Sequence, residues 1–127
     1  MRKQYHFRPS KNGLYAWDVH RLIDLSKDIE PKYISLTSLE ELNENYWFGG
    51  KDDAPTCAAI AEHCKLIAAT ELNYPIILSS NGRVMDGMHR ACKAYIEGKA
   101  EIKVVQFAND PEPDFIDVQH PDDLPYD

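Results

Sequence analysis

The sequence predicts an α/β (α+β) fold in which a small mixed β-sheet is flanked by helices. Three observations support this fold class: segments with apolar residues at helical spacing, short apolar runs between them, and a Ser-Asn-Gly turn joining two of these runs. From residue 32 the predicted order is strand, short helix, loop, helix, strand, turn, strand, helix, strand. The 127 residues suit one ordinary domain.

We divide the chain into a helical extension (1–30), the sheet-containing domain (31–108) and an acidic, proline-rich tail (109–127). Residues 7–13 combine Pro, Ser, Asn and Gly, which is typical of a loop. From residue 16 to 27, apolar residues recur on one helical face and charged residues on the other. We therefore expect a helix that covers one face of the sheet.

The domain begins with an alternating stretch, residues 32–36, that predicts a strand. Ser38 and Glu41 have capping-box spacing, so a short helix is expected through Asn43, followed by a loop over 44–54. The clearest helix runs from Pro55 to Thr70. Its expected buried stripe is Cys57, Ile60, Ala61, Cys64, Ile67 and Ala68.

Two strands, 75–78 and 83–85, are predicted on either side of a hairpin-type turn at 80–82. The helix after them should end at Gly98, followed by a strand over 102–107. Its expected inner stripe is Met88, Ala91, Cys92, Tyr95 and Ile96. The tail from residue 109 carries four prolines and is expected to run extended over the surface.

The net charge of −7 lies on residues 110–127, which hold seven acidic residues and no Lys or Arg. This balance disfavours duplex DNA as a partner. No apolar run approaches the roughly 20 residues of a membrane span, and no signal-peptide core follows the basic start, so we expect a cytoplasmic protein. The three cysteines form no C-x-x-C motif and are expected to be free, mostly buried thiols.

The turn Asp86-Gly87-Met88-His89-Arg90 is the main candidate site. It ends a strand and places His89 and Arg90 on the first turn of a helix, where backbone N–H groups are unpaired and an anion is favoured. Gly87 permits close approach of a ligand, and Arg90 supplies a forked donor. The alternative is structural: Asp86 caps the helix or pairs with Arg90, while His89 and Arg90 make internal hydrogen bonds.

Residues 74–107 resemble the ParB/sulfiredoxin superfamily. The matching segments are the strand 76–78, the stretch from Asn81 to Arg90, Ala94, and the strand 102–105, and the strand 33–36 resembles the opening element of the family. The resemblance implies the fold of the 31–108 domain. It also implies nucleotide phosphate contacts at Gly87, Met88, His89 and Arg90, with ATP or CTP and magnesium as the candidate cofactors.

Two departures from the family narrow this expectation. Sulfiredoxins place a reactive Cys after the glycine, and Met88 stands there in this chain, so reductase chemistry is not expected. Cys92 lies one helical turn later and does not replace it. Partition proteins add DNA-binding and dimerisation domains, for which this chain is too short.

Two further places offer candidate residues. Trp47 and Lys51, in an aromatic and glycine-containing loop, could stack a nucleobase and contact a phosphate, or Trp47 could be core. Glu62 and His63 border the apolar stripe of their helix. Either residue could face the site and act as a base, or both could lie on the solvated edge of the helix. No cluster of metal-binding residues is evident.

We expect a nucleotide- or phosphate-binding protein, with His89 and Asp86 as candidate catalytic groups in phosphoryl transfer or nucleotide hydrolysis. The alternative is a non-catalytic module that senses a nucleotide or another anionic small molecule, contacts a protein partner or self-associates. A ParB-like nuclease is the weaker alternative, because acids for two metals are not clustered.

Overall fold

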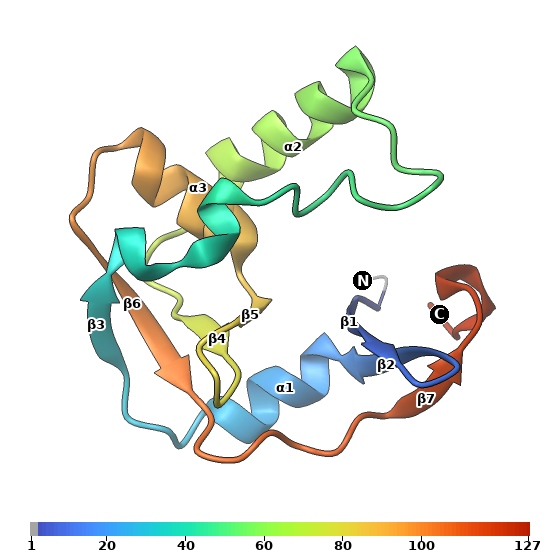
Figure 1. Ribbon diagram of the computed structural model, residues 1–127. Coiled ribbons are helices and arrows are strands. Elements are labelled where there is room, and N and C mark those ends of the chain that lie inside the picture. The colour runs from blue at the N-terminus through green and yellow to red at the C-terminus, as the bar shows by residue number, and fades with distance from the viewer. Residues whose placement is uncertain (1–2) are drawn as a thin grey trace.

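Two β-sheets organise the computed structural model, which describes residues 3–127 (Figure 1). The first sheet is antiparallel and has the order β1-β2-β7, formed by Tyr5–Ser10, Gly13–Asp18 and Phe115–Val118. The second has the order β3-β6-β4-β5, formed by Lys32–Ser35, Glu101–Gln106, Ile76–Leu78 and Val84–Asp86. Strands β4 and β6 are parallel and the other pairs antiparallel, so the predicted mixed sheet and α+β fold class are confirmed.

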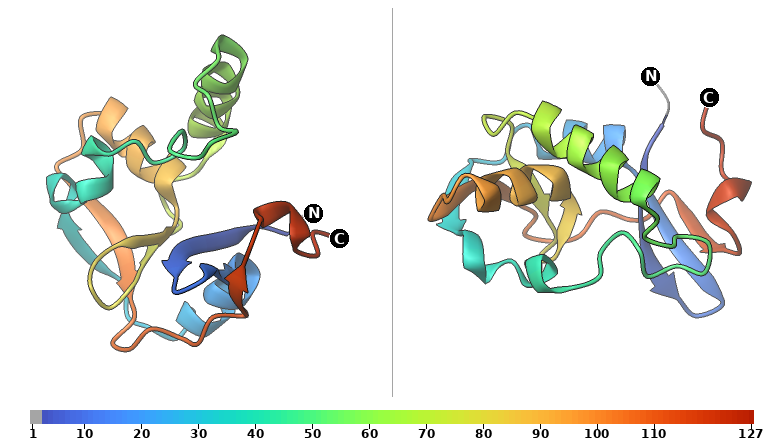
Figure 2. Two further views of the ribbon diagram at one scale, coloured as in Figure 1. Left: turned by 45° about the vertical axis from the view of Figure 1, so that its right-hand side comes forward. Right: turned by 90° about the horizontal axis from the view of Figure 1, so that it is seen from above.

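Three α-helices accompany these sheets: α1 (Val19–Ser26), α2 (Cys57–Ala69) and α3 (Met88–Ile96). Short 3-10 helices are η1 (Leu36–Ser38), η2 (Glu40–Asn43) and η3 (Pro121–Asp123). Helices α1 and α3 lie on opposite sides of the four-stranded sheet, and α2 lies beyond α3 (Figures 1 and 2). In the part of the chain that the structure describes, no helix has both the length and the apolar character needed to cross a membrane.

The four-stranded sheet is buried on both faces because alternate residues of its strands point to opposite sides. Ile76 and Leu78 join the core cluster beneath α3, whereas Ile77 joins the cluster that contains Leu22 of α1 and Trp17 of β2. The sheet is therefore the middle layer between α3 and α1. The candidate turn at residues 86–90 lies where this middle layer passes into α3.

The N-terminal segment differs from the prediction, because residues 7–13 belong to a β-hairpin formed by β1 and β2 instead of a loop. Ser10 pairs with Gly13 at its tip, and Pro9 is tolerated because β1 is an edge strand. Helix α1 begins at Val19, later than predicted. Its N-cap is Asp18, whose carboxylate accepts a 2.9 Å hydrogen bond from the His20 N–H. Residues 3–30 are thus a hairpin plus a short helix.

The acidic tail is also more ordered than the extended chain that we predicted. Strand β7 pairs with β2, and Val118 and Leu124 form a small cluster with Ala16. The Trp17 indole N–H donates to the Pro111 carbonyl at 2.8 Å. The tail therefore closes onto the N-terminal hairpin, and both belong to one β-structured unit.

Helix α2 is confirmed, and its start is set by Thr56, whose hydroxyl accepts a 3.1 Å hydrogen bond from the Ala59 N–H. The predicted buried stripe is wrong, because no residue of α2 is buried. Ile60 is 47% exposed and Leu66 is 50% exposed. Cys57 and Cys64 are exposed and only Cys92 is half-buried, so the prediction of mostly buried thiols is also wrong.

The segment from β4 to the end of α3 agrees best with the prediction. Gly82, at φ 84°, completes the turn by donating from its N–H to the Ser79 carbonyl at 2.9 Å. Gly98, at φ 72°, follows α3 as expected for a C′ residue. The inner stripe is shorter than predicted, because Tyr95 and Ile96 are 64% and 72% exposed.

Candidate functional site

Strand β5 passes into α3 through Gly87, whose φ of 109° is rarely adopted by residues with a side chain. A Cβ atom added there would lie 2.7 Å from Arg90 Nη2 and 3.0 Å from Ile76 Cγ1. Gly87 therefore makes room for the protein's own arginine. Gly87 is also the N-cap and has no side-chain hydrogen bond, so the predicted capping by Asp86 is wrong.

Arg90 is engaged by acceptors of the protein itself. Its Nη2 donates to the Pro75 carbonyl at 3.2 Å and to the Asp86 carboxylate at 3.3 Å. The side chains of Arg90 and Asp86 are only 17% and 21% exposed. The alternative pairing of Asp86 with Arg90 is thus confirmed, and it fixes the guanidinium on the side of the sheet that faces α1.

The first turn of α3 offers two free backbone donors. The Arg90 and Ala91 N–H groups both donate to the Gly87 carbonyl, at 3.0 and 3.1 Å. The N–H groups of Met88 and His89 have no acceptor among residues 3–127. The Met88 side chain is 5% exposed and belongs to the core beneath α3, so only its backbone is available to a ligand.

His89 contacts a second histidine that comes from α2. The distance from His89 Nε2 to His63 Nδ1 is 2.9 Å, and the two imidazole rings are 5.2 Å apart. Trp47 stacks on both rings, at 4.3 Å from His63 and 4.6 Å from His89. Because the imidazoles are so close together, they share one face of the indole. We call His63, His89 and Trp47 the histidine pair site.

The electrostatic setting keeps His89 uncharged at neutral pH. Burial lowers its pKa below the ordinary value, the neighbouring His63 and Arg90 lower it further, and Asp86 opposes them. An N–H···N hydrogen bond between two imidazoles needs one ring to donate and the other to accept. If the pair gains one further proton, the two facing nitrogens can share a proton along this bond.

The histidine pair site opens onto a small pocket of about 310 Å³. Its lining includes Trp47, Phe48 and His63 together with Asp52 and Asp53 of the preceding loop. Trp47 also packs against the core beneath α3. The imidazole rings cover one face of its indole, and core residues support the same side chain. The structure thus brings Trp47 to His89.

Two of the other candidates lie outside this arrangement. Lys51 is exposed and is not among the residues that line the pocket. Glu62 is exposed on α2, as the solvated-edge alternative predicted. Over the described range 3–127, His, Cys, Asp and Glu side chains form no cluster of three or more that could hold a metal ion.

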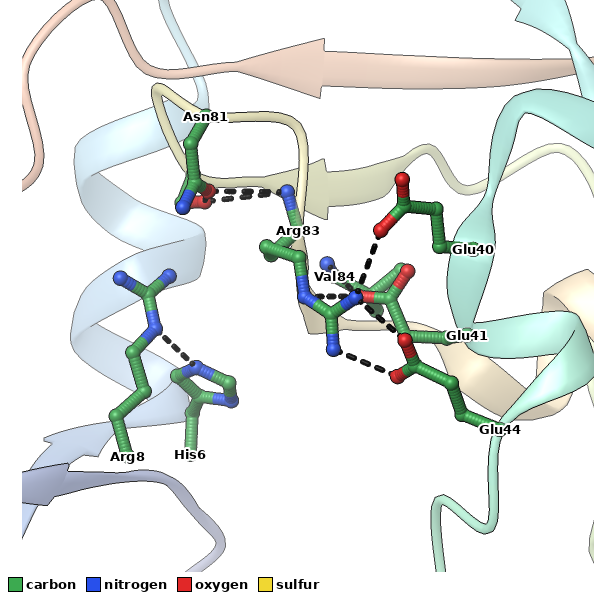
Figure 3. A network of polar contacts seen from close by, with 9 residues as sticks. His6, Arg8, Glu40, Glu41, Glu44, Asn81, Arg83 and Val84 are labelled. Carbon is green, nitrogen blue, oxygen red and sulfur yellow. Dashed lines mark hydrogen bonds and ion pairs between the residues drawn. The ribbon is translucent and has the colours of Figure 1, made fainter.

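A second polar cluster, which the sequence did not indicate, surrounds Arg83 (Figure 3). Its guanidinium pairs with Glu44 at 2.7 Å, with Glu40 at 3.4 Å and with Glu41 at 3.4 Å. Glu41 is 2% exposed and accepts a 2.6 Å hydrogen bond from the Val84 N–H, so the predicted capping box with Ser38 is wrong. The cluster ties η2 to β5.

Across a cleft of about 570 Å³ from Arg83 lie His6 and Arg8 of β1 (Figure 3). Arg8 donates from Nε to His6 Nε2 at 3.1 Å, and its Nη1 pairs with Asp110 at 3.3 Å. Burial lowers the pKa of His6 to about 4, and the charge of Arg8 adds to this effect. Both arginines of the cleft are therefore paired with carboxylates of the protein, although Arg8 Nη2 is buried and has no hydrogen-bond partner.

The sequence located both halves of the histidine pair site without joining them. His63 and His89 are 26 positions apart on different helices, so no local pattern records their contact. Helical spacing was the signal that could have been used, because Ala59, His63 and Ile67 are the half-buried positions of α2.

No protein-family model, curated protein or solved structure matches this chain. The resemblance to the ParB/sulfiredoxin superfamily remains a prediction, and inferences about function rest on the site geometry.

Proposed function

We propose that the protein binds a phosphate-bearing small molecule, such as a nucleotide, at the histidine pair site. The observation that carries the proposal is the 2.9 Å contact between His63 and His89 beside the start of α3. The free N–H groups of Met88 and His89 supply two donors there. A protonated imidazole supplies a third donor and a positive charge, which suits a phosphate oxygen at a helix N-terminus.

Phosphate binding would be coupled to proton uptake. His89 is uncharged at neutral pH because burial lowers its pKa, and a bound dianion favours its protonated form. Affinity should therefore rise as the pH falls from 8 towards about 6, the second pKa of a phosphate group. Below that value the ligand itself gains a proton and the gain levels off.

The same pair is suited to move a proton in phosphoryl transfer or nucleotide hydrolysis. One imidazole would accept the proton of the attacking hydroxyl or water, and its partner would share that proton through the existing hydrogen bond. Asp86 is held by Arg90, which favours a positioning role for this carboxylate. ATP or CTP with magnesium are the ligands to examine first.

The test is isothermal titration of inorganic phosphate, ATP and CTP, with and without magnesium, into the wild type and His89→Gln. Glutamine keeps a hydrogen-bonding side chain and removes the titratable group, so we expect about tenfold weaker binding and loss of the pH dependence. His20→Gln, at an exposed position of α1, is the matched control. Equal binding by the wild type and His89→Gln would refute the proposal.

A second candidate function, self-association, is favoured by the exposure of α2. This helix has no buried residue, and its only charged side chains are Glu62 and Lys65. Two copies that pair antiparallel about the middle of α2 would place Glu62 of each opposite Lys65 of the other. Small residues such as Ala61 on the outer face would permit close approach of the helices.

Sedimentation velocity tests this candidate. Glu62→Lys should weaken the dimer by placing like charges opposite one another, and the double change Glu62→Lys with Lys65→Glu should restore it. A monomer at all concentrations, or no rescue by the double change, would eliminate self-association through α2 and leave phosphate binding untouched.

A further inference from the structure

A second, chemically different pocket lies on the opposite side of the candidate turn. It has a volume of about 330 Å³ and is enclosed by α1, the segment after it, β4 and β6. Its walls are mainly apolar and include Ile29, Ile77 and Val105. A mostly apolar cavity of roughly 300 Å³ or more with few polar groups is the usual form of a small-molecule site.

The polar part of this pocket is the Asp86–Arg90 pair. Both hydrogen bonds of the guanidinium use Nη2, so Nη1 and Nε have no acceptor among the described residues. Arg90 Nε is buried as well as unpartnered. Nε is closed off by the protein, whereas Nη1 is not among the buried unpartnered atoms, so Nη1 is the donor that a ligand oxygen can reach.

The mouth of the pocket combines apolar surface with a cation. Ile23 is 49% exposed and Tyr74 is 59% exposed, and both line the pocket. Lys27, the residue after α1, and Pro31 are also exposed lining residues. The lining contains two cations, Lys27 and Arg90, and one carboxylate, Asp86, so it has an excess of one positive charge. This charge favours a singly charged anion over a cation or a neutral molecule.

We propose that this pocket binds a small organic carboxylate with an apolar body. The carboxylate would accept hydrogen bonds from Arg90 and lie near the Lys27 ammonium, and the apolar body would pack against Ile29, Ile77 and Val105. A guanidinium fixed by Asp86 and Pro75 is an oriented donor, so little side-chain freedom is lost on binding.

The carboxylate pocket is separate from the histidine pair site. Neither His63 nor His89 lines it, and neither Asp86 nor Arg90 lines the pocket beside Trp47. The inference therefore goes beyond phosphate binding and does not depend on it.

The test is an NMR titration of the ¹⁵N-labelled full chain with hexanoate and indole-3-acetate, against the neutral hexanamide and indole-3-acetamide. We expect amide shifts at Ile29, Ile77 and Val105, with the acids binding about tenfold more tightly than the matched amides. Lys27→Gln should weaken the acids about threefold and leave the amides unchanged. Lys11→Gln, exposed at the tip of the β1–β2 hairpin, is the charge-matched control.

Ile23→Trp tests the position directly, because a larger side chain at this exposed rim should obstruct the mouth and remove binding of acids and amides alike. His89→Gln should leave carboxylate binding unchanged. The proposal is overturned if acids and amides bind equally, if the shifts centre on His63 and His89, or if millimolar acid causes no shift. Phosphate binding at the histidine pair site is measured separately, by the titration of inorganic phosphate, and can hold or fail independently of the carboxylate pocket.

Discussion

His89 and Arg90 are neighbours in the sequence and serve different halves of the molecule. His89 contacts His63 of α2 and the Trp47 indole, beside two free backbone N–H groups. Arg90 faces α1, where Asp86 and Pro75 hold it at the edge of an apolar pocket. The motif that looked like one site therefore makes contacts in two directions, and only the His89 side adjoins the free N–H groups of α3.

The difference shows how a helix start distributes consecutive side chains. Residues on the first turn are about 100° apart around the axis, since the helix has 3.6 residues per turn. One of them faces the outer helix and the next faces the sheet. Two consecutive basic residues at such a turn are therefore predicted to make contacts in different directions. Their two charges then do not act on the same ligand.

The largest effect should come from Gly87, on which both sides depend. In Gly87→Ala the backbone strain at φ 109° adds to the clash of Cβ with Arg90 Nη2 and Ile76, so we expect a loss of more than about 2 kcal/mol in urea denaturation. Gly82→Ala is the matched control, because φ is 84° there and nothing lies within 4 Å of the added Cβ. It should lose only about 1 kcal/mol. Equal losses would mean that Arg90 does not occupy the space beside Gly87.

The next effect separates structural stability from ligand binding. Arg90→Met leaves the Asp86 carboxylate without its partner in a largely buried position, so unfolding should become easier by roughly 2 kcal/mol. His89→Gln should cost less than about 1 kcal/mol and remove the response to phosphate. Calorimetry with and without phosphate measures both. The reverse ranking would assign the ligand role to Arg90 and the structural role to His89.

Acid should reveal a third difference, this time between His89 and His6. Both histidines have a lowered pKa in the folded protein. The contribution of each neutral histidine to the free energy of unfolding is therefore fully present above pH 6.5, the pKa in the unfolded chain, and is lost as the pH falls towards the pKa in the folded protein. For His6, with a folded pKa of about 4, the loss amounts to roughly 3 kcal/mol.

Chemical denaturation at pH 7 and pH 4 should therefore show that His6→Gln removes more of the acid sensitivity than His89→Gln. In an NMR titration, phosphate should raise the pKa of His89 and leave that of His6 unchanged. A phosphate-induced rise at His6 would instead place the anion in the cleft beside Arg8.

The smallest effect is expected at Lys51, which the sequence proposed as a phosphate ligand. Lys51→Ala removes an exposed side chain that does not line the pocket, so stability should change by less than about 0.5 kcal/mol. Phosphate affinity should remain within about twofold, apart from a weak long-range charge effect. A larger loss in the same calorimetric titration would bring Lys51 back into the site.

The elements that the sequence predicted well are those defined by local chemistry. The turn at Asn81 and Gly82, the short apolar run from Ile76 to Leu78 and the glycine after α3 depend on residues a few positions apart. The pairing of β2 with β7 could not be found in this way. It joins residues about a hundred positions apart, and the Pro and Gly residues near its ends are typical of loops.

Burial was the less predictable property, because periodicity shows which positions share a face and not what covers that face. In α2 the apolar spacing at Cys57, Ile60 and Cys64 is real, yet no second layer packs over it. The prediction of the candidate site was right in part and wrong in part for the same reason. The donors of α3 were visible locally, whereas the contact of His89 with His63 and the turn of Arg90 towards α1 arise only when distant segments pack.

The exposure of α2 has a thermodynamic consequence for the site that it helps to build. His63 is carried on a helix that has no buried residue; if α2 also adopted a placement with His63 away from His89, the free energy of restoring the observed placement would reduce every affinity measured at His63. A molecule that covers the outer face of α2 and an anion bound beneath it would each favour the same placement of the helix. Their affinities are then linked, and each must strengthen the other by the same factor.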